Sequence, residues 1–255
     1  MPGVPGVPGV PGVPGVPGVP GVPGVLSYDG VMTTGADSQR DHWSRTFATR
    51  PDFLGAEPSV VGDAALARFH AAGTRELLEL GPGQGRDTIE FAAAGLDVTA
   101  LDFAEPGLAE IADKAARAGV AGSIRTVVAD VRDPLPFADG AFDACYAHML
   151  LCMALTTDEV VRLTGEIRRV LRAGGLLVYT VRTTADAHFG AGVDHGDDRW
   201  EMGGFVVHFF DRALVERLAE GWDLLEVADH EEGKLPRRLF AVTMRRSSES
   251  VEEAG

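Results

Sequence analysis

Apolar runs rich in β-branched residues alternate with amphipathic segments from residue 57 onward. The apolar runs predict strands at 76–80, 97–102, 125–129, 142–147, 176–181, 222–228 and 239–244. Helical spacing of apolar positions predicts helices through 71, over 86–94, 105–118 and 158–171, and to 219, with Ser59, Thr157 and Asp211 as N-caps. This alternation predicts an α/β fold with a mainly parallel sheet, and the polar turn at 231–236 predicts an antiparallel hairpin at its edge.

A glycine-rich segment lies between the first predicted strand and the helix after it. It reads Glu79-Leu80-Gly81-Pro82-Gly83-Gln84-Gly85, with glycines at every second position from 81. A glycine turn here lets a ligand approach the backbone and the N-terminus of the helix. The dinucleotide pattern G-x-G-x-x-G would place its third glycine at position 86, which is arginine. The segment therefore disfavours a nicotinamide-dependent oxidoreductase.

Further motifs follow the glycine segment. Asp102 ends the second predicted strand, where a carboxylate can accept hydrogen bonds from both ribose hydroxyls. Asp130 follows the third strand, L-P-F-A-D-G-A-F-D occupies 135–143, and R-V-L-R-A-G-G occupies 169–175. In this order the motifs resemble those of the class I S-adenosylmethionine-dependent methyltransferases, over roughly residues 57–246. Residues 85–88 and 95–102 look most like the branch that contains tellurite-resistance and thiopurine-type small-molecule methyltransferases.

The resemblance implies a Rossmann-like seven-stranded sheet of order 3-2-1-4-5-7-6, with the last strand antiparallel and helices on both faces. It also implies S-adenosylmethionine as cofactor and an enzyme that moves its methyl group to a small-molecule acceptor by direct in-line displacement. In the family, the aspartate at the position of Asp130 lies by the adenine amine. The residues that we expect to bind the cofactor are Trp43, Glu79, Gly81, Gly83, Gly85, Asp102, Phe103, Asp130, Val131 and Ala147.

Candidate acceptor residues follow the fourth and fifth strands, because ligands of open α/β sheets bind beyond the carboxyl ends of the strands. His148 is the candidate general base, with a hydrogen-bonded structural histidine as the alternative. Arg182 is the candidate for holding an anionic acceptor, with an ordinary ion pair as the alternative. Residues 147–150 lack the N-P-P-Y or D-P-P-Y loop of members that methylate adenine or glutamine, which disfavours base methylation. A thiol, a metalloid anion, and an oxygen or nitrogen nucleophile all stay open as acceptor.

Two segments outside this alternation are expected to cover the site. The arm at 32–58 carries Trp43 and Phe53, which would fold over the cofactor or simply pack on the sheet. The insert at 186–210 holds five glycines and predicts a mobile loop that acts as a lid over the acceptor. Its Asp and His residues match no metal-ligand spacing, so we expect no metal.

Pro-Gly-Val triplets fill residues 2–25 and cannot build a core, because proline removes backbone donors and glycine raises chain entropy. We therefore expect a disordered repeat tract over 1–31, a methyltransferase domain over 32–246 and a disordered acidic tail over 247–255. Cys145 and Cys152 are too few for a disulfide framework or a four-ligand zinc site.

The net charge of the chain indicates which kinds of partner it can bind. Asp and Glu total 38 against 23 Lys and Arg, a net charge of −15, which disfavours nucleic acid because phosphate binding needs clustered basic side chains. No apolar run of about 18 residues and no signal-peptide pattern is present, so we expect a soluble cytoplasmic protein without a membrane partner. A protein-directed methyltransferase and a non-catalytic S-adenosylmethionine-binding protein are the alternatives to a small-molecule enzyme.

Overall fold

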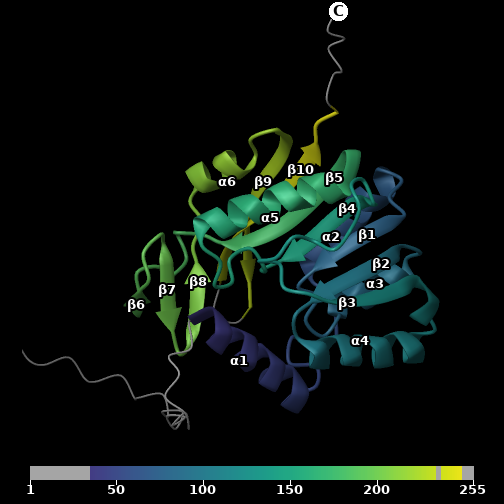
Figure 1. Ribbon diagram of the computed structural model, residues 1–255, viewed down its shortest axis with the longest axis horizontal. Helices are drawn as coiled ribbons and strands as arrows, with labels where there is room; N and C mark the ends of the chain where they lie inside the picture. The colour runs from purple at the N-terminus through teal and green to yellow at the C-terminus, as the bar shows by residue number, and fades with distance from the viewer. Residues whose placement is uncertain (1–34, 234–236, 249–255) are drawn as a thin grey trace, which may run out of the picture. The chain divides into compact units, whose positions relative to one another are not determined.

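The computed structural model describes residues 35–233 and 237–248 (Figure 1). The repeat tract expected over 1–31 and residues 249–255 of the expected tail lie outside the described residues. The expectation of disorder in these segments therefore stays a prediction, as do the domain boundaries at 31 and 246.

A seven-stranded sheet forms the centre of the described part. Its strands are β1 (Glu76–Leu80), β2 (Asp97–Asp102), β3 (Ile124–Val128), β4 (Phe142–His148), β5 (Leu171–Arg182), β9 (Trp222–Glu232) and β10 (Arg237–Arg246). The order is β3-β2-β1-β4-β5-β10-β9. Strands β1 to β5 pair in parallel, whereas β10 is antiparallel to both β5 and β9. The predicted order and the antiparallel last strand are confirmed.

Helices cover both faces of this sheet (Figure 1). They are α2 (Val60–Ala71), α3 (Arg86–Ala93), α4 (Glu105–Ala118), α5 (Thr157–Val170) and α6 (Arg212–Leu218), and a short 3-10 helix, η1, spans Ala121–Ser123. Successive side chains of a strand point to opposite faces. Leu77 of β1 accordingly packs with Phe69 of α2 and Phe91 of α3, while its neighbour Leu78 packs with Leu163 of α5. In the central strands β1, β2, β4 and β5 both faces are mostly buried, which is why these strands are mainly apolar, whereas β3 and β9 at the edges are more exposed.

The predicted N-caps are confirmed for two helices and wrong for one. Ser59 caps α2 and Asp211 caps α6. Helix α5, however, is capped by Thr156 rather than Thr157, and it begins one residue earlier than expected. The reason is a capping box: the Thr156 hydroxyl accepts the Glu159 backbone N–H at 3.2 Å, and the Glu159 carboxylate accepts the Thr156 N–H at 2.8 Å.

The insert expected to be an irregular loop is instead a small antiparallel sheet, which we call the meander. It consists of β6 (Val193–Asp194), β7 (Arg199–Met202) and β8 (Phe205–His208). Its glycines occupy turns rather than loosen the segment: Gly203 and Gly204 have φ of 60° and 85° between β7 and β8. Long-range backbone bonds fix the meander to the segment after β4, with the His208 N–H donating to the Cys152 carbonyl at 3.0 Å.

The arm contains helix α1 (Gly35–Thr49), which contacts α4 and β8. In Figure 1 this helix lies beside the meander and the carboxyl ends of the central strands.

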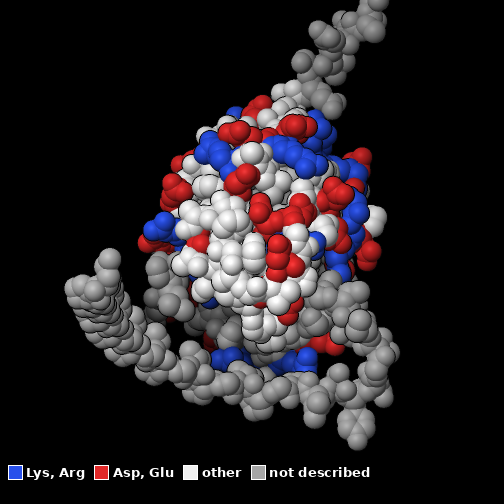
Figure 2. All heavy atoms as spheres, turned by 90° about the vertical axis from the view of Figure 1, so that its left-hand side faces the viewer, with Lys and Arg blue, Asp and Glu red and all other residues white. Residues whose placement is uncertain are grey.

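Among the described residues, no helix combines the length and the apolar character needed to cross a bilayer. On the face in Figure 2, basic side chains form separate small groups interspersed with acidic ones.

Candidate active site

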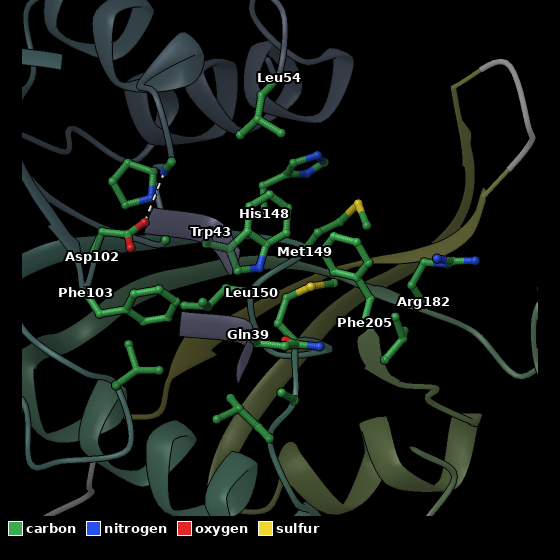
Figure 3. A pocket seen from close by; sticks show the side chains of 18 of the residues that line it. Gln39, Trp43, Leu54, Asp102, Phe103, His148, Met149, Leu150, Arg182 and Phe205 are labelled. Atoms are coloured by element: carbon green, nitrogen blue, oxygen red, sulfur yellow. Dashed lines mark hydrogen bonds between the residues drawn. The ribbon is translucent and has the colours of Figure 1, made fainter. Parts of the chain in front are cut away.

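A cavity of about 580 Å³ opens at the carboxyl ends of β1, β2 and β4. This is where an open α/β sheet binds its ligands, and the volume lies within the range of small-molecule sites, roughly 300 to 1,000 Å³. Most of the expected site residues line it: Trp43, Glu79, Gly81, Gly83, Asp102, Phe103, Asp130, Val131, His148 and Arg182. Residues from β1 and β2 form one end, which we call the cofactor end. The segment after β4 and the meander form the other, the acceptor end, and the arm contributes side chains to both ends (Figure 3).

The glycine loop after β1 forms the floor of the cofactor end. Gly81, Gly83 and Gly85 have φ of 67°, 57° and 80°, a region that residues with a Cβ rarely adopt. A Cβ at Gly83 would lie 2.6 Å from Leu54 Cδ1, inside the space that the loop shares with the arm. Gly107 of α4 lies so close to the glycine loop that a Cβ there would be only 2.4 Å from the carbonyl oxygen of Gly83. The N-terminus of α4 thus packs directly on the loop.

Asp102 projects from the end of β2 beside this loop. Its Oδ1 accepts the Ala104 N–H at 2.9 Å, and its Oδ2 accepts the Gly83 N–H at 3.3 Å, the bond drawn in Figure 3. Burial raises the pKa of Asp102 to about 6, although these backbone hydrogen bonds act in the opposite direction. Two backbone donors therefore hold a carboxylate at the cavity wall with lone pairs left for a ligand.

Glu79 lies beneath the loop and is almost completely buried. Burial, and secondly the negative charge of Asp87, raises the pKa of Glu79 to about 8. The Thr88 hydroxyl donates to its Oε2 at 2.6 Å, and Asp87 is held in turn by the Ser59 N–H at 2.6 Å and the Tyr146 hydroxyl at 3.1 Å. Because its pKa is raised, Glu79 is largely protonated at neutral pH and can donate a hydrogen bond of its own.

Asp130 lies at the cavity wall but already has a strong partner. Arg132 donates to both of its oxygens, at 3.0 and 2.6 Å. Burial alone would raise the pKa of Asp130, but the hydrogen bonds and the charge of Arg132 outweigh it and lower the pKa. Beside it, Val131 contributes apolar surface to the same wall.

Two residues expected at the cofactor do not line the cavity. Ala147 is fully buried in the core between the sheet and α5, because its place in β4 turns its side chain to the helix-covered face. Gly85 is the N-cap of α3, and a Cβ there would lie 2.5 Å from Cγ1 of Ile111. Gly85 therefore shapes the loop by allowing α4 to pack against it.

His148 ends β4 and faces two polar partners. Its Nδ1 lies 3.0 Å from the Thr180 hydroxyl, and its Nε2 lies 3.1 Å from Oε2 of Glu232 at the end of β9. The second contact is close but poorly aligned, so neither Nε2 nor Oε2 has a well-directed hydrogen-bond partner among the described residues. Glu232 is held on its other oxygen by Arg86 at 3.1 Å. Mainly the contact with His148, and to a smaller extent Arg86, lowers the pKa of Glu232 to about 2.

The residue after His148 has a strained backbone. Met149 has φ of 54°, an uncommon value for a residue with a Cβ, and its N–H donates to the Thr180 hydroxyl at 2.9 Å. Such strain persists only where the surroundings hold it, and it is frequent at functional sites. Here it turns the chain so that His148, Met149 and Leu150 all line the cavity.

Arg182 lines the acceptor end, and two of its three side-chain nitrogens have partners within the chain. Its Nε donates to Asp186 at 2.9 Å and its Nη2 bonds the other Asp186 oxygen, with both side chains buried. Asp186 also accepts the Arg238 backbone N–H at 2.9 Å. This geometry favours the ion-pair alternative for Arg182, because its Nε and Nη2 are used within the chain, and a contact with an anionic acceptor stays a prediction.

The sequence reasoning missed several residues at the acceptor end. They come from distant segments and share a position on the cavity wall: Gln39, Met153, Trp200, Met202, Phe205, Phe209 and Glu232. None belongs to a motif, and only the close spacing of large apolar side chains at 200, 202 and 205 hinted at a buried face. The expectation that this insert covers the acceptor end is supported by its place, although its structure is a sheet.

Helix α1 and the meander meet above the cavity in what we call the roof. Gln39 Nε2 donates to the Val206 carbonyl at 2.8 Å, and the rings of His42 and Trp43 lie 4.2 and 5.6 Å from that of Phe205. Trp43 also lies 5.4 Å from Phe47, which lines the cofactor end. These ring contacts connect the covers of the two ends, and Figure 3 shows Trp43 and Phe205 side by side in the roof. Within the described part of the chain, no group of three or more His, Cys, Asp or Glu could hold a metal ion.

The comparisons with known proteins agree with this geometry. Residues 78–179 match the model of the methyltransferase domain family. This segment is thus similar to the class I S-adenosylmethionine-dependent methyltransferases, and the sheet order and the glycine loop agree with that similarity. S-adenosylmethionine is the cofactor of this class, and the glycine cradle and the oriented Asp102 fit its nucleoside.

Individual relatives differ in what they methylate. The chain is 30% identical over 125 residues to malonyl-[acyl-carrier protein] O-methyltransferase of Pectobacterium atrosepticum, covering 49% of this chain and 45% of that protein. It is 36% identical over 110 residues to thiol S-methyltransferase TMT1B of Homo sapiens, covering 43% of each. It therefore spans less than half the length of either relative. Among solved structures, 1,6-didemethyltoxoflavin-N1-methyltransferase of Burkholderia thailandensis has a TM-score of 0.66 at 21% identity, covering 87% of this chain and 94% of that one.

Proposed function

We propose that the protein transfers a methyl group from S-adenosylmethionine to a small-molecule acceptor inside this cavity. One observation carries the proposal: a single cavity joins the glycine loop and Asp102 at one end to an apolar compartment beneath α1 and the meander at the other. A nucleoside at the first end and an acceptor at the second would then share one water-poor space, which is what an in-line displacement requires.

Asp102 would accept hydrogen bonds from the ribose hydroxyls, since its carboxylate is already oriented by Gly83 and Ala104. The backbone of the glycine loop would lie against the polar tail, and Phe103 and Val131 would flank the adenine. Trp43 would close this end from above. Asp130, held by Arg132, would present an oxygen toward the adenine amine. The proposed domain extends over 32–246, as the motifs indicate.

When bound, S-adenosylmethionine supplies an activated methyl carbon, whose bond to sulfur breaks as an acceptor lone pair forms the new bond. The residues of the chain must then orient the acceptor, exclude water and accept any proton that it loses. We assign the proton to the pair of His148 and Glu232. A proton at Nε2 would form an imidazolium 3.1 Å from a carboxylate whose pKa is lowered to about 2, so that the carboxylate balances its charge.

Arg182 would act as a positioning residue. Its ion pair with Asp186 joins the end of β5 to the segment that leads into the meander, and its Nη2 lies 2.8 Å from Nδ1 of His188, which also lines the cavity. The guanidinium also lies 5.3 Å from the centre of the Phe209 ring. These contacts support the wall of the acceptor end.

Three features favour a small molecule over a protein as acceptor. The roof closes over the cavity through the Gln39–Val206 hydrogen bond and the Phe205 ring contacts, which leaves little room for an extended polypeptide. The segment after β4 lacks the loop of family members that methylate adenine or glutamine. The neighbouring toxoflavin enzyme, by its name, acts on a small molecule.

The test is calorimetric titration of S-adenosylhomocysteine into the full chain, with NAD as a competing ligand. Asp102→Asn should weaken binding about tenfold or more, or ~1.4 kcal/mol, because it removes the charged acceptor of two hydrogen bonds. Asp97→Asn is the matched control, since Asp97 is an exposed aspartate at the other end of β2. Binding of NAD in preference to S-adenosylhomocysteine would refute the proposal.

A further inference from the structure

The acceptor end of the cavity has an apolar and aromatic wall. The side chains that build it come from the segment after β4 and from the meander: Met149, Leu150, Met153, Trp200, Met202, Phe205 and Phe209. Several of these rings pack edge to face, with Phe189 lying 6.2 Å from Trp200 and 5.6 Å from Phe209. Aromatic and methionine walls bind flat apolar molecules well, because the rings offer large rigid surfaces and methionine adapts to irregular shapes.

The charged groups on this wall are already neutralised. Arg182 pairs with Asp186, and Arg86 pairs with Glu232 at 3.1 Å. Arg237 lines the cavity but is exposed to solvent. A buried anion needs a dedicated cation, since the cost of removing its water is otherwise not recovered. Among the described residues of the acceptor end, every buried guanidinium has a carboxylate partner within the chain.

Some polar atoms of the same wall lack partners. Gln39 is only 3% exposed and lines the cavity, and its Nε2 donates to the Val206 carbonyl, so Oε1 is the acceptor atom of this side chain. Nε1 of Trp200 is buried without a hydrogen-bond partner, as are Nε2 of His148 and Oε2 of Glu232. An unpaired buried donor or acceptor is costly, and native proteins leave few of them. These atoms supply both donors and acceptors to one cavity, and a ligand that pairs with them removes the cost.

We propose that the methyl acceptor is a neutral, ring-bearing small molecule with hydrogen-bonding groups on its edge, methylated on an oxygen or nitrogen that carries a proton. The inference rests on the proposed function and selects among the acceptors that the sequence leaves open. Trp200 Nε1–H would donate to an oxygen or nitrogen of the ring system, and Gln39 Oε1 would accept an N–H or O–H. A metalloid oxyanion lacks the apolar surface that the wall fits, and it would meet no unpaired buried cation.

The proposed step balances without a further reactant. The lone pair of the acceptor oxygen or nitrogen forms a bond to the methyl carbon, and the carbon–sulfur bond breaks with its electrons going to sulfur, which leaves S-adenosylhomocysteine. The proton of the O–H or N–H passes to the pair of His148 and Glu232, whose atoms Nε2 and Oε2 lack aligned partners. A thiolate or an oxyanion would have no proton to deliver there.

The test uses the full chain saturated with S-adenosylhomocysteine and four probes in calorimetry. The neutral probes are 2-naphthol and 7-hydroxyquinoline, and the anionic probes are 2-naphthoate and selenite. We expect the neutral ring compounds to bind at least about tenfold more tightly than either anion, and to be methylated when S-adenosylmethionine replaces the product. Tighter binding of an anion, or no binding of the neutral rings to the saturated protein, overturns the inference.

The first stage of the same titration separates the two proposals. If S-adenosylhomocysteine itself does not bind, the proposed function fails and this inference fails with it. If it binds and the order of the acceptor probes is reversed, the inference alone fails.

A conservative substitution tests the polar edge. Trp200→Phe keeps the ring but removes the Nε1–H donor, and we expect at least threefold weaker binding of 7-hydroxyquinoline with unchanged affinity for S-adenosylhomocysteine. Val193→Ala is the control in the same meander, since Val193 is exposed on β6. Equal affinity of the Trp200→Phe variant and the control for 7-hydroxyquinoline would contradict the assignment of Trp200.

Discussion

The cofactor end and the acceptor end of the cavity are built in different ways. The cofactor end consists of short segments that each follow one strand of the sheet, and its shape comes from backbone conformations that glycine adopts readily. The acceptor end brings together side chains from α1, the segment after β4, the meander and β9, which are far apart in the sequence. A binding site for a shared cofactor is thus encoded locally, whereas a site for a particular acceptor depends on long-range packing.

The largest effect should come from the acceptor end and concern turnover. His148→Gln removes the nitrogen that we assign to proton transfer, and general acid–base groups contribute about a hundredfold or more. We expect that loss in kcat with an unchanged Kd for S-adenosylhomocysteine, measured by single-turnover kinetics and calorimetry. His70→Gln, at an exposed histidine of α2, is the control. An equal loss of cofactor affinity would place His148 at the cofactor end instead.

The next effect should come from the cofactor end. Gly107→Ala places a Cβ 2.4 Å from the Gly83 carbonyl oxygen, so the glycine loop or α4 must shift. Such overpacking costs about 1 to 3 kcal/mol, and we expect both weaker binding of S-adenosylhomocysteine and a lower free energy of unfolding.

A second glycine-to-alanine substitution, at Gly165, is the control for Gly107→Ala. Gly165 lies in helix α5 and has open space around its missing Cβ. Gly165→Ala should therefore raise the free energy of unfolding by up to about 1 kcal/mol through helix propensity alone. If Gly107→Ala behaved in the same way, the close packing of α4 on the loop would be refuted.

A smaller effect should show whether the two ends act together. Phe205→Ala removes the ring that contacts His42 and Trp43 in the roof, and aromatic pairs contribute about 0.5 to 1.5 kcal/mol. We expect both S-adenosylhomocysteine and the acceptor to dissociate faster, by up to about tenfold, in stopped-flow measurements. A change confined to the acceptor would show that the covers of the two ends are independent.

The smallest effect on ligand binding is expected for Glu79, which lies beneath the glycine loop. Its substitution is therefore followed through the free energy of unfolding. The pKa of Glu79 is raised from 4.5 to about 8, so the folded protein holds a proton that the unfolded chain releases as the pH rises between these values. Because Glu79 ionises at lower pH in the unfolded chain than in the folded protein, the free energy of unfolding falls progressively as the pH rises from 4.5 to about 8. Glu79→Gln cannot ionise, so its free energy of unfolding relative to the parent protein should rise with pH.

Urea titrations across this pH range measure the difference, with the exposed Glu220→Gln as the control. A difference that does not change with pH would mean that Glu79 ionises normally in the folded protein.

The sequence predicts five of the helices from local periodicity, and its resemblance to a family predicts the sheet order and the place of the cofactor end. It predicts less of the acceptor end. The sequence predicts a loop in place of the meander, because the strands of the meander have only two to four residues and its glycines resemble a flexible segment. The position of Arg182 after β5 predicts a contact with the acceptor, because nothing in the sequence shows that Asp186, four residues on, faces it. Likewise, Glu232 reaches His148 only through the pairing of β9 with β10.

The most direct test of the two-ended cavity is a crystal structure of the protein with S-adenosylhomocysteine bound. We expect the ribose hydroxyls to lie within hydrogen-bonding distance of the Asp102 carboxylate and the sulfur to face the compartment lined by His148 and Met149. A ligand bound beneath the meander, or with its sulfur directed away from His148, would contradict this expectation.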